Sequence, residues 1–435
     1  MSTIDAPIGI IERRVQDEAK RQALDIDSDT GERALRALID AEIDRWSDDF
    51  RRGVRTTEIP DRARAARQTF DNIARYGPLS ALLDDDDVWE IMINSPASIF
   101  VKRHSGPGGY HHEGFLDDEH VNRTLTRLLD RASSAHRKLD PSEGLQDAQL
   151  DSGARLHIVH GDLSRGGHIM VNIRKFTGVT FSGLEQLVER GMLDPGAARF
   201  LSACVRARQT IIFAGVPGSG KTTLLSCCAA ELDPSLRVVV AEEVFEADLP
   251  LPNVASMQTR PPRPDRPGID LRRLVSGFLR MAPDVAIVGE VRDKEALPLL
   301  LTLSSGVKGF TTIHAGSARQ ALTRLRFICQ LADTASEIPL GALNTLVSEA
   351  IDVVVHTDRG PNGPEVMSII AVEDLAGGTD AVQFTVTELF ARARHGEPLR
   401  WTGQIPSRLA AGFAKVGSDV GDVLSAHYRP SEVAS

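Results

Sequence analysis

Apolar residues recur at helix-like spacing among many charged ones in the first part of the chain, up to residue 76. Ile11–Val15 and Ala34–Ile39 show this pattern, which is typical of amphipathic helices. Pro60 and Gly77 interrupt it. We therefore predict two or three helices in residues 1–76. The pattern leaves open whether they form a small bundle, a docking appendage or a solvated spacer.

A different pattern begins near Gly77 and continues to residue 175. A short helix is expected at Leu79–Leu83, and a longer one, with leucines on one face, at Asp117–Ser134. Short apolar stretches bounded by turn residues predict strands between these helices and after them. The predicted strands are Val88–Asn94, Ser98–Lys102, Leu150–His160 and His168–Arg174. Together these elements predict a compact α+β domain over residues 77–175.

Residues 176–195 are interpreted as a linker that contains a short helix, and the pattern changes again from Gly196 onward. Near-continuously apolar strands then alternate with helical stretches, which predicts an α/β domain over residues 196–435. Its sheet should be mostly parallel and covered by helices on both faces. The predicted strands are Thr210–Ala214, Arg237–Ala241, Val285–Gly289, Gly309–Ile313 and Ile351–His356. After about Gly377 the signal weakens to one strand, Val382–Leu389, and one terminal helix, Ser407–Ala426.

The composition is that of an ordinary soluble globular chain, since 42% of the 435 residues are hydrophobic and 25% are charged. The formal net charge of −10 argues against a general nucleic-acid binder, so no direct nucleic-acid binding is expected. We expect no signal peptide, because the N-terminus lacks a basic region followed by an apolar run, and no membrane span, because no apolar run reaches about 18 residues. The four cysteines lack metal-ligand or secreted-framework spacing, which suits a reducing cytoplasm. Cys227 and Cys228 are expected to be buried thiols.

The stretch from Thr210 to Thr223 carries the most specific chemistry of the chain. An apolar strand leads into Gly215-Val216-Pro217-Gly218-Ser219-Gly220-Lys221-Thr222, which fits the phosphate-binding pattern G-x-x-x-x-G-K-[ST], and a helix follows. Glycines let the backbone approach a phosphate, and the helix start offers it partial positive charge. Lys221 is expected to reach the β- and γ-phosphates of ATP, and Thr222 to ligate Mg²⁺. The predicted nucleotide-binding residues are Gly215, Pro217, Gly218, Ser219, Gly220, Lys221, Thr222 and Thr223.

Three further predicted strands end in polar residues, at the edge where a parallel sheet forms its ligand crevice. Glu242, with Glu243 beside it, could orient or deprotonate the water that attacks the γ-phosphate. Glu290 could hold the water shell of Mg²⁺, since this ion keeps several waters. His314 could sense the γ-phosphate through a hydrogen bond. We therefore select Glu242, Glu290 and His314 as candidate catalytic residues, with Thr222 and Glu290 as candidate metal ligands.

In this order the motifs resemble the ATPases that power type II secretion, type IV pili and type IV secretion. Within that group they most resemble the CpaF-type ATPase of tight-adherence (Tad/Flp) pilus systems. The motifs are the Walker A loop Gly215–Thr222, the Asp box Ala241–Glu243, the CpaF-like stretch Thr259–Pro262, the Walker B segment Pro283–Arg292 and the His box Thr311–Ala315. The resemblance covers about Gly77 to Leu389. Glu243 replaces the usual aspartate, Gln149 a usual arginine, and Gly316 a common asparagine.

The resemblance implies a RecA-like P-loop ATPase that binds ATP and Mg²⁺ and assembles into a homohexamer. It implies that nucleotide is held between the α+β domain and the ATPase domain. Arg155 and Arg174 match positions that the family places near the γ-phosphate, where guanidinium groups suit developing charge. The implied partners are inner-membrane platform proteins. They would hold this cytoplasmic motor at the inner face of the membrane while it drives pilin assembly or secretion.

Two other functions stay open. A conjugation-type DNA-transfer traffic ATPase would have the same core. A nucleotide-dependent assembly scaffold would bind ATP but turn it over negligibly. Glu242 and Glu290 favour a hydrolysing motor over a scaffold, because both carboxylates have a use in hydrolysis.

Replacing Lys221 by alanine should abolish hydrolysis and weaken nucleotide binding, because the substitution removes the charge that faces the β- and γ-phosphates. The fold should survive, since the lysine is expected to face the ligand. ATP binding and phosphate release of Lys221→Ala are compared with those of the wild-type protein. Wild-type binding and turnover in this variant would show that the Walker A assignment is wrong.

Overall fold

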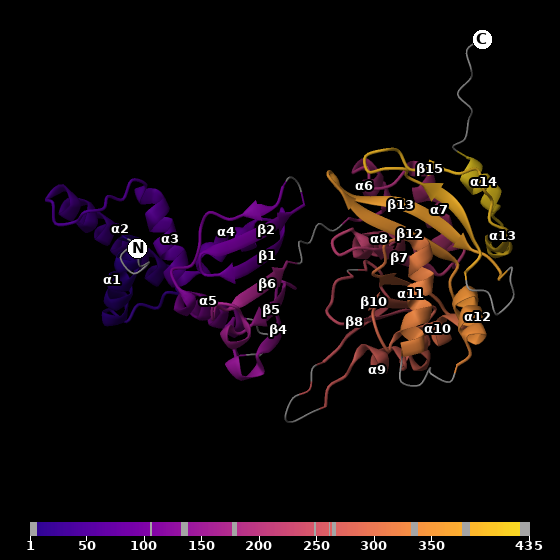
Figure 1. Ribbon diagram of the computed structural model, residues 1–435, viewed down its shortest axis with the longest axis horizontal. Helices are drawn as coiled ribbons and strands as arrows, with labels where there is room; N and C mark the ends of the chain where they lie inside the picture. The colour runs from indigo at the N-terminus through magenta and orange to yellow at the C-terminus, as the bar shows by residue number, and fades with distance from the viewer. Residues whose placement is uncertain are drawn as a thin grey trace, which may run out of the picture. The chain divides into compact units, whose positions relative to one another are not determined.

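The structure is a computed structural model that describes residues 7–104, 107–131, 138–175, 181–247, 249–260, 262, 267–331, 338–375 and 383–426. The chain divides into two compact units, Met1–Gly178 and Val179–Ser435 (Figure 1). Each unit is described separately below. Among the helices of the described residues, none combines the length and the apolar character that crossing a bilayer requires.

The first unit begins with a bundle of amphipathic helices, as the spacing of apolar residues predicts. The helices are α1 (Pro7–Arg21), α2 (Asp29–Arg51) and α3 (Arg62–Ala74). Ser28 and Asp61 cap α2 and α3 by accepting hydrogen bonds from backbone N–H groups of the first turn. Val15, Ile39 and Phe70, one from each helix, are buried against one another in a common core. This shared core distinguishes a bundle from a solvated helical spacer.

The remainder of the first unit is an antiparallel sheet with α5 packed on one face. The strands are ordered β3-β2-β1-β6-β5-β4. The elements are η2 (Gly77–Leu79), α4 (Ser80–Asp84), β1 (Val88–Ser95), β2 (Ser98–Arg103), β3 (Gly109–Tyr110), α5 (Asp118–Asp130), η3 (Pro141–Glu143), β4 (Leu145–Gln149), β5 (Arg155–Val159), η4 (Gly161–Leu163) and β6 (Met170–Arg174). The predicted strand Leu150–His160 is wrong in its first half, because the Leu150 and Ala154 backbones close the turn between β4 and β5.

The second unit is an α/β domain with a mostly parallel sheet, as predicted. Its strands are ordered β15-β14-β13-β12-β7-β11-β10-β8-β9, and those from β12 to β9 run parallel. The strands are β7 (Ile211–Gly215), β8 (Val238–Glu242), β9 (Val254–Gln258), β10 (Val285–Val291), β11 (Lys308–Ile313), β12 (Val353–Gly360), β13 (Gly363–Val372), β14 (Val386–Ala391) and β15 (Arg400–Trp401). The β12–β13 hairpin adds the antiparallel strands β13, β14 and β15 to one side of the sheet.

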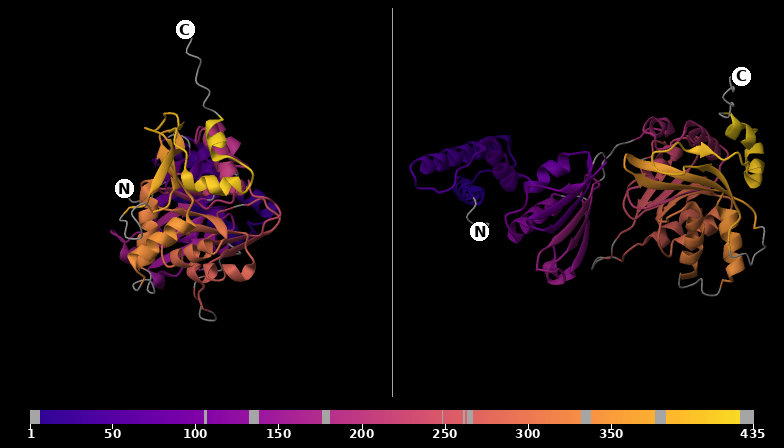
Figure 2. Two further views of the ribbon diagram at one scale, coloured as in Figure 1. Left: turned by 90° about the vertical axis from the view of Figure 1, so that its right-hand side faces the viewer. Right: turned by 45° about the horizontal axis from the view of Figure 1, so that its top comes forward.

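Helices cover both faces of this sheet. One face carries α6 (Leu184–Glu189), α7 (Pro195–Arg206), α8 (Lys221–Ala229), α13 (Ser407–Ala414) and α14 (Val420–Ser425). The other face carries α9 (Leu271–Val275), η5 (Phe278–Met281), α10 (Ala296–Ser304), α11 (Ala318–Leu331) and α12 (Leu340–Ala350). Both views of Figure 2 keep the orange helices α11 and α12 on the side opposite to the yellow helices α13 and α14. Cys204, Cys227, Cys228 and Cys329 are free and buried in these two layers, as expected for Cys227 and Cys228.

The second unit differs from the prediction in several places, and its strands β9, β13 and β15 are absent from the prediction. Residues 176–195 were interpreted as a linker, but the described part from residue 181 packs into the second unit, where Leu184 and Leu187 are buried. The single terminal helix Ser407–Ala426 is instead the two helices α13 and α14. The chain turns at Gly417, whose N–H donates to Ala414, and Asp419 then caps the second helix. Val382, the predicted start of the last strand, lies outside the described residues, and β14 begins at Val386.

Asp352, just before β12, joins three parts of the second unit. Its buried carboxylate accepts hydrogen bonds from Thr210 N (2.8 Å) and Lys308 Nζ (2.7 Å) with one oxygen, and from Arg408 (3.2 Å) with the other.

Replacement of Asp352 by asparagine should lower the free energy of unfolding by roughly 3 kcal/mol, because two cations lose their buried partner. Chemical denaturation measures the change. Glu32→Gln, which breaks an exposed helix pair, is the matched control and should cost much less. An equal loss in both variants would contradict the prediction.

Candidate nucleotide site

The loop between β7 and α8 has the backbone shape of a phosphate cradle. Gly220 precedes α8 with a φ of +83°, a left-handed conformation that favours glycine. Among the described residues no side chain caps this helix, so the N–H groups of its first turn are oriented into the loop. Val216, Pro217 and Gly218 are exposed at the crest of the loop, whereas Ser219 is buried beneath it. These observations fit the binding of an anionic phosphate chain.

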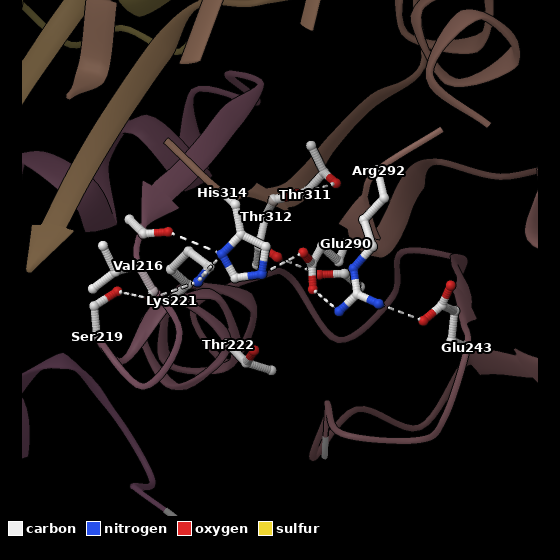
Figure 3. Close-up of polar contacts among 12 residues, drawn as sticks. Val216, Ser219, Lys221, Thr222, Glu243, Glu290, Arg292, Thr311, Thr312 and His314 are labelled. Carbon is white, nitrogen blue, oxygen red and sulfur yellow. Dashed lines mark hydrogen bonds and ion pairs between the residues drawn. The ribbon is translucent and has the colours of Figure 1, made fainter. Parts of the chain in front are cut away.

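Lys221 lies under the crest of the loop, at the first position of α8 (Figure 3). Its ammonium donates a hydrogen bond to the carbonyl of Val216 at 2.9 Å and lies 3.4 Å from Nδ1 of His314. The same Nδ1 is 3.2 Å from the carbonyl of Gly215. Lys221, which the sequence predicts to bind the phosphates, therefore contacts His314, which the sequence predicts to sense the γ-phosphate.

Glu290 is the centre of an ion-pair cluster at the carboxyl ends of β10 and β11 (Figure 3). One carboxylate oxygen is 2.7 Å from Nε2 of His314, and the other is 2.6 Å from Arg292. Arg292 also contacts Glu243 at 2.8 Å. Burial raises the pKa of Glu290, but the hydrogen bonds from His314 and Arg292 outweigh it and lower the pKa to about 2. The ionised carboxylate therefore stabilises the fold above about pH 4.5, and this contribution is lost as the pH falls toward about 2.

Glu242 ends β8 and is almost fully buried. Its Oε1 accepts hydrogen bonds from the backbone N–H groups of Glu246 (3.1 Å) and Ala247 (3.0 Å). These bonds bring Glu246 back toward the P-loop, where the Thr222 hydroxyl lies 3.4 Å from its carboxylate. The buried Glu242 thus holds the loop that presents a second carboxylate to the first turn of α8.

The predicted metal ligands are placed on neighbouring elements. Thr222 contacts Glu246, and both oxygens of Glu290 are engaged by His314 and Arg292. Within the described residues there is no group of three or more histidine, cysteine, aspartate or glutamate side chains that could hold a metal ion by itself. This donor set fits Mg²⁺, which usually keeps several waters and binds through one or two carboxylates together with substrate phosphates.

Arg155 and Arg174 belong to the first unit, on the adjacent strands β5 and β6. They lie directly opposite each other in the sheet, and Glu90 of β1 is paired with Arg174 on the other side. The Arg174 guanidinium is 3.5 Å from the buried carboxylate of Glu90. The structure thus brings the two arginines together, and their role at a nucleotide stays a prediction.

Sequence reasoning missed three contacts at this site. Arg292 follows Glu290 by two positions, and this spacing on an extended segment could have indicated an ion pair. Glu246 lies four residues after Glu242, in a loop without a periodic pattern. Thr357 reaches the P-loop from β12, and no local signal could have indicated a contact with Ser219 over 138 positions.

The fold and the loop together have the form of a P-loop nucleotide-binding domain. Comparison with known proteins then identifies the chain as a member of the type II/IV secretion system protein family, whose model matches residues 73–357. A putative conjugal transfer protein of Mycobacterium tuberculosis (strain H37Rv) is 30% identical over 310 residues, which cover 69% of this chain and 85% of that protein. The type IV secretion system protein PtlH of Bordetella pertussis is 31% identical over 301 residues, which cover 64% of this chain and 87% of that protein. Among solved structures, the chain is similar to the VirB11 ATPase from the Brucella suis type IV secretion system, with 26% sequence identity and a TM-score of 0.36. The match covers 67% of this chain and 91% of that one.

Glu242→Gln should retain ATP binding and lower turnover by roughly 10²–10⁴-fold, because the amide keeps the shape of the side chain but cannot accept a proton. Steady-state phosphate release and ATP affinity are measured on the full chain. Glu388→Gln, an exposed glutamate on β14, is the matched control and should behave as wild type. Normal turnover of Glu242→Gln would transfer the role of base to Glu290, whose glutamine variant should then be inactive. If both variants hydrolyse ATP normally, the two-carboxylate site is wrong.

Proposed function

We propose that this chain is the ATP-hydrolysing, hexameric motor of a Tad/Flp pilus or a related type II/IV secretion system. The observation that carries the proposal is the continuous set of contacts from Lys221 of the P-loop through His314 to Glu290. This arrangement links a phosphate-binding group to a carboxylate at the strand ends.

Hydrolysis follows from the roles of the side chains. Bound MgATP supplies the phosphoryl group and the metal charge that stabilises its transfer. Lys221 and the N–H groups of α8 would hold the phosphates, and Thr222 and Glu290 would hold the metal, which would supply positive charge to the phosphates. Glu242 orients the attacking water and accepts its proton. When Lys221 turns toward the phosphates, its contact with His314 must change, so His314 can report the state of the site to Glu290.

The mechanical part of the proposal follows from the family resemblance. Hydrolysis in one subunit of a homohexamer would change the angle between the α+β domain, residues 77–175, and the ATPase domain, residues 196–435. An inner-membrane platform protein would receive this motion. The chain would act from the cytoplasm and remain peripheral at the inner face of the membrane through that partner.

A conjugation-type DNA-transfer traffic ATPase is the second candidate. The similarity to a putative conjugal transfer protein of M. tuberculosis favours it, whereas the net charge of −10 disfavours direct DNA contact. Phosphate release measured with and without DNA, and with and without the platform protein, separates the two functions. Stimulation by DNA alone would favour the second candidate. Negligible turnover under every condition would favour a scaffold.

Arg155→Ala and Arg174→Ala test whether the first unit contributes to hydrolysis. An arginine supplied to a P-loop can increase the rate by about 10³–10⁵-fold. We expect at least one variant to assemble normally, bind ATP and lose most of its turnover. Assembly is followed by light scattering, so that loss of the ring is not mistaken for loss of chemistry.

The matched control for the two arginines is Arg165→Ala, an exposed arginine in the connection between β5 and β6. It should assemble and hydrolyse ATP as the wild-type protein does. Wild-type rates in assembled Arg155→Ala and Arg174→Ala proteins would rule out their catalytic role. The first unit would then be a docking module.

A further inference from the structure

The β12–β13 hairpin contacts the P-loop at several points. Strand β12 pairs in parallel with β7, so that Thr357 is the partner of Gly215. Gly215 lies so close to this strand that a Cβ atom on it would be 2.2 Å from the carbonyl oxygen of Thr357. The Arg359 guanidinium donates a hydrogen bond to the carbonyl of Gly218 at 3.0 Å. Pro364 of β13 packs against Gly220, where a Cβ atom would be 3.1 Å from its ring.

Thr357 makes the most enclosed of these contacts. Its side chain is fully buried, and Oγ1 lies 2.8 Å from Oγ of Ser219, which is also fully buried. Thr357 Oγ1 is also 3.2 Å from the carbonyl of Ala214, and Ser219 Oγ is 2.8 Å from the carbonyl of Val216. Each hydroxyl has one hydrogen to donate, so at most two of these three contacts are hydrogen bonds at one time. When Ser219 donates to the carbonyl of Val216, Thr357 can donate to Ser219 and so orient its hydroxyl.

The carbonyl of Val216 connects this pair to the lysine of the site. It accepts a hydrogen bond from Ser219 and a second one, at 2.9 Å, from Nζ of Lys221. Lys221 must leave this carbonyl when it turns toward the β- and γ-phosphates. The Val216 carbonyl then keeps the two hydrogen bonds from Ser219, one from the hydroxyl at 2.8 Å and one from the backbone N–H at 3.3 Å. The Thr357 hydroxyl beside Ser219 can fix the direction of the first of these bonds.

The hairpin that carries Thr357 is itself firmly held. The buried Glu365 of β13 accepts hydrogen bonds from the backbone N–H of Gly396 at 3.0 Å and lies 2.7 Å from His395. The buried Arg392 donates from Nε to the carbonyl of Val366 at 3.0 Å. A site is positioned accurately only when the supporting residues are themselves fixed. Thr357 meets that requirement, because its strand is fixed on both sides.

We propose that Thr357 is a positioning residue for nucleotide binding, which acts through Ser219 to keep the P-loop shaped while Lys221 moves to the phosphates. The inference rests on the proposed function, because it requires that the P-loop binds nucleotide. It gives a residue of β12 a role in the nucleotide site, although β12 lies outside the phosphate-binding motif. Thr357 does not touch the phosphates in this role.

The test uses Thr357→Val, which keeps the shape of the side chain and removes the hydroxyl, in the full chain. The dissociation constant of fluorescent mant-ADP in Mg²⁺ buffer should rise roughly five- to thirty-fold, because a buried hydrogen bond is lost next to the loop. Thr357→Ser keeps the hydroxyl and should bind within about threefold of wild type. The matched control is Thr302→Val, since Thr302 is a buried threonine on α10 whose hydroxyl donates a hydrogen bond to the carbonyl of Pro298 in its own helix.

A double-mutant cycle separates positioning from general destabilisation. Ser219→Ala should weaken mant-ADP binding, and Thr357→Val should add little in that background, because both residues act through one hydrogen bond. Thermal unfolding of every variant confirms the fold. Wild-type affinity of folded Thr357→Val, or full additivity with Ser219→Ala, would overturn the proposal. If Lys221→Ala also binds mant-ADP normally, the failure lies in the nucleotide site itself and not in the role of Thr357.

Discussion

The parallel pairing of β7 with β11 and β12 is the constraint on which the site depends. It places Ala214 beside Ile313 on one side and beside His356 on the other, so that the P-loop leaves the sheet next to His314 and Thr357. Strands β8 and β10 end at the same edge with Glu242 and Glu290 because their directions are shared. Backbone hydrogen bonds thus gather residues that are far apart in the chain, before any side chain contributes.

The charges at this edge offset one another. Glu290 is largely buried, and a buried carboxylate is tolerated only when it is paired and hydrogen-bonded. His314 and Arg292 provide both, and Arg292 is in turn paired with the half-exposed Glu243. An arriving phosphate chain brings negative charge to a cluster that is already satisfied. Binding therefore has to rearrange existing pairs, and such a rearrangement can couple nucleotide state to the surrounding strands.

The sequence predicted the strands that carry the site because each is a short, nearly continuous apolar run in a buried parallel sheet. It also predicted the P-loop, where Gly220, Lys221 and Thr222 follow from local chemistry. It failed at Leu150 and near Gly417, where a turn interrupts an apolar pattern that continues through it. Thr357 could not be predicted, because its contact with Ser219 depends on which strand lies beside β7. The roles of Arg155 and Arg174 stay predictions for a similar reason, since local sequence does not determine whether residues of one domain contact a nucleotide bound to another.

The burial of the cysteines has a practical consequence for labelling this protein with dyes. Burial raises the pKa of Cys227 and Cys329 to about 12 and raises the pKa of Cys204 and Cys228 well above the usual thiol value, so these thiols have little nucleophilic thiolate at neutral pH. A maleimide dye would therefore react almost only with a cysteine introduced on the surface. One such residue in each unit, for example at the exposed positions 165 and 388, would give a fluorescence donor and acceptor. Energy transfer between them would report the distance between the units during turnover in single molecules.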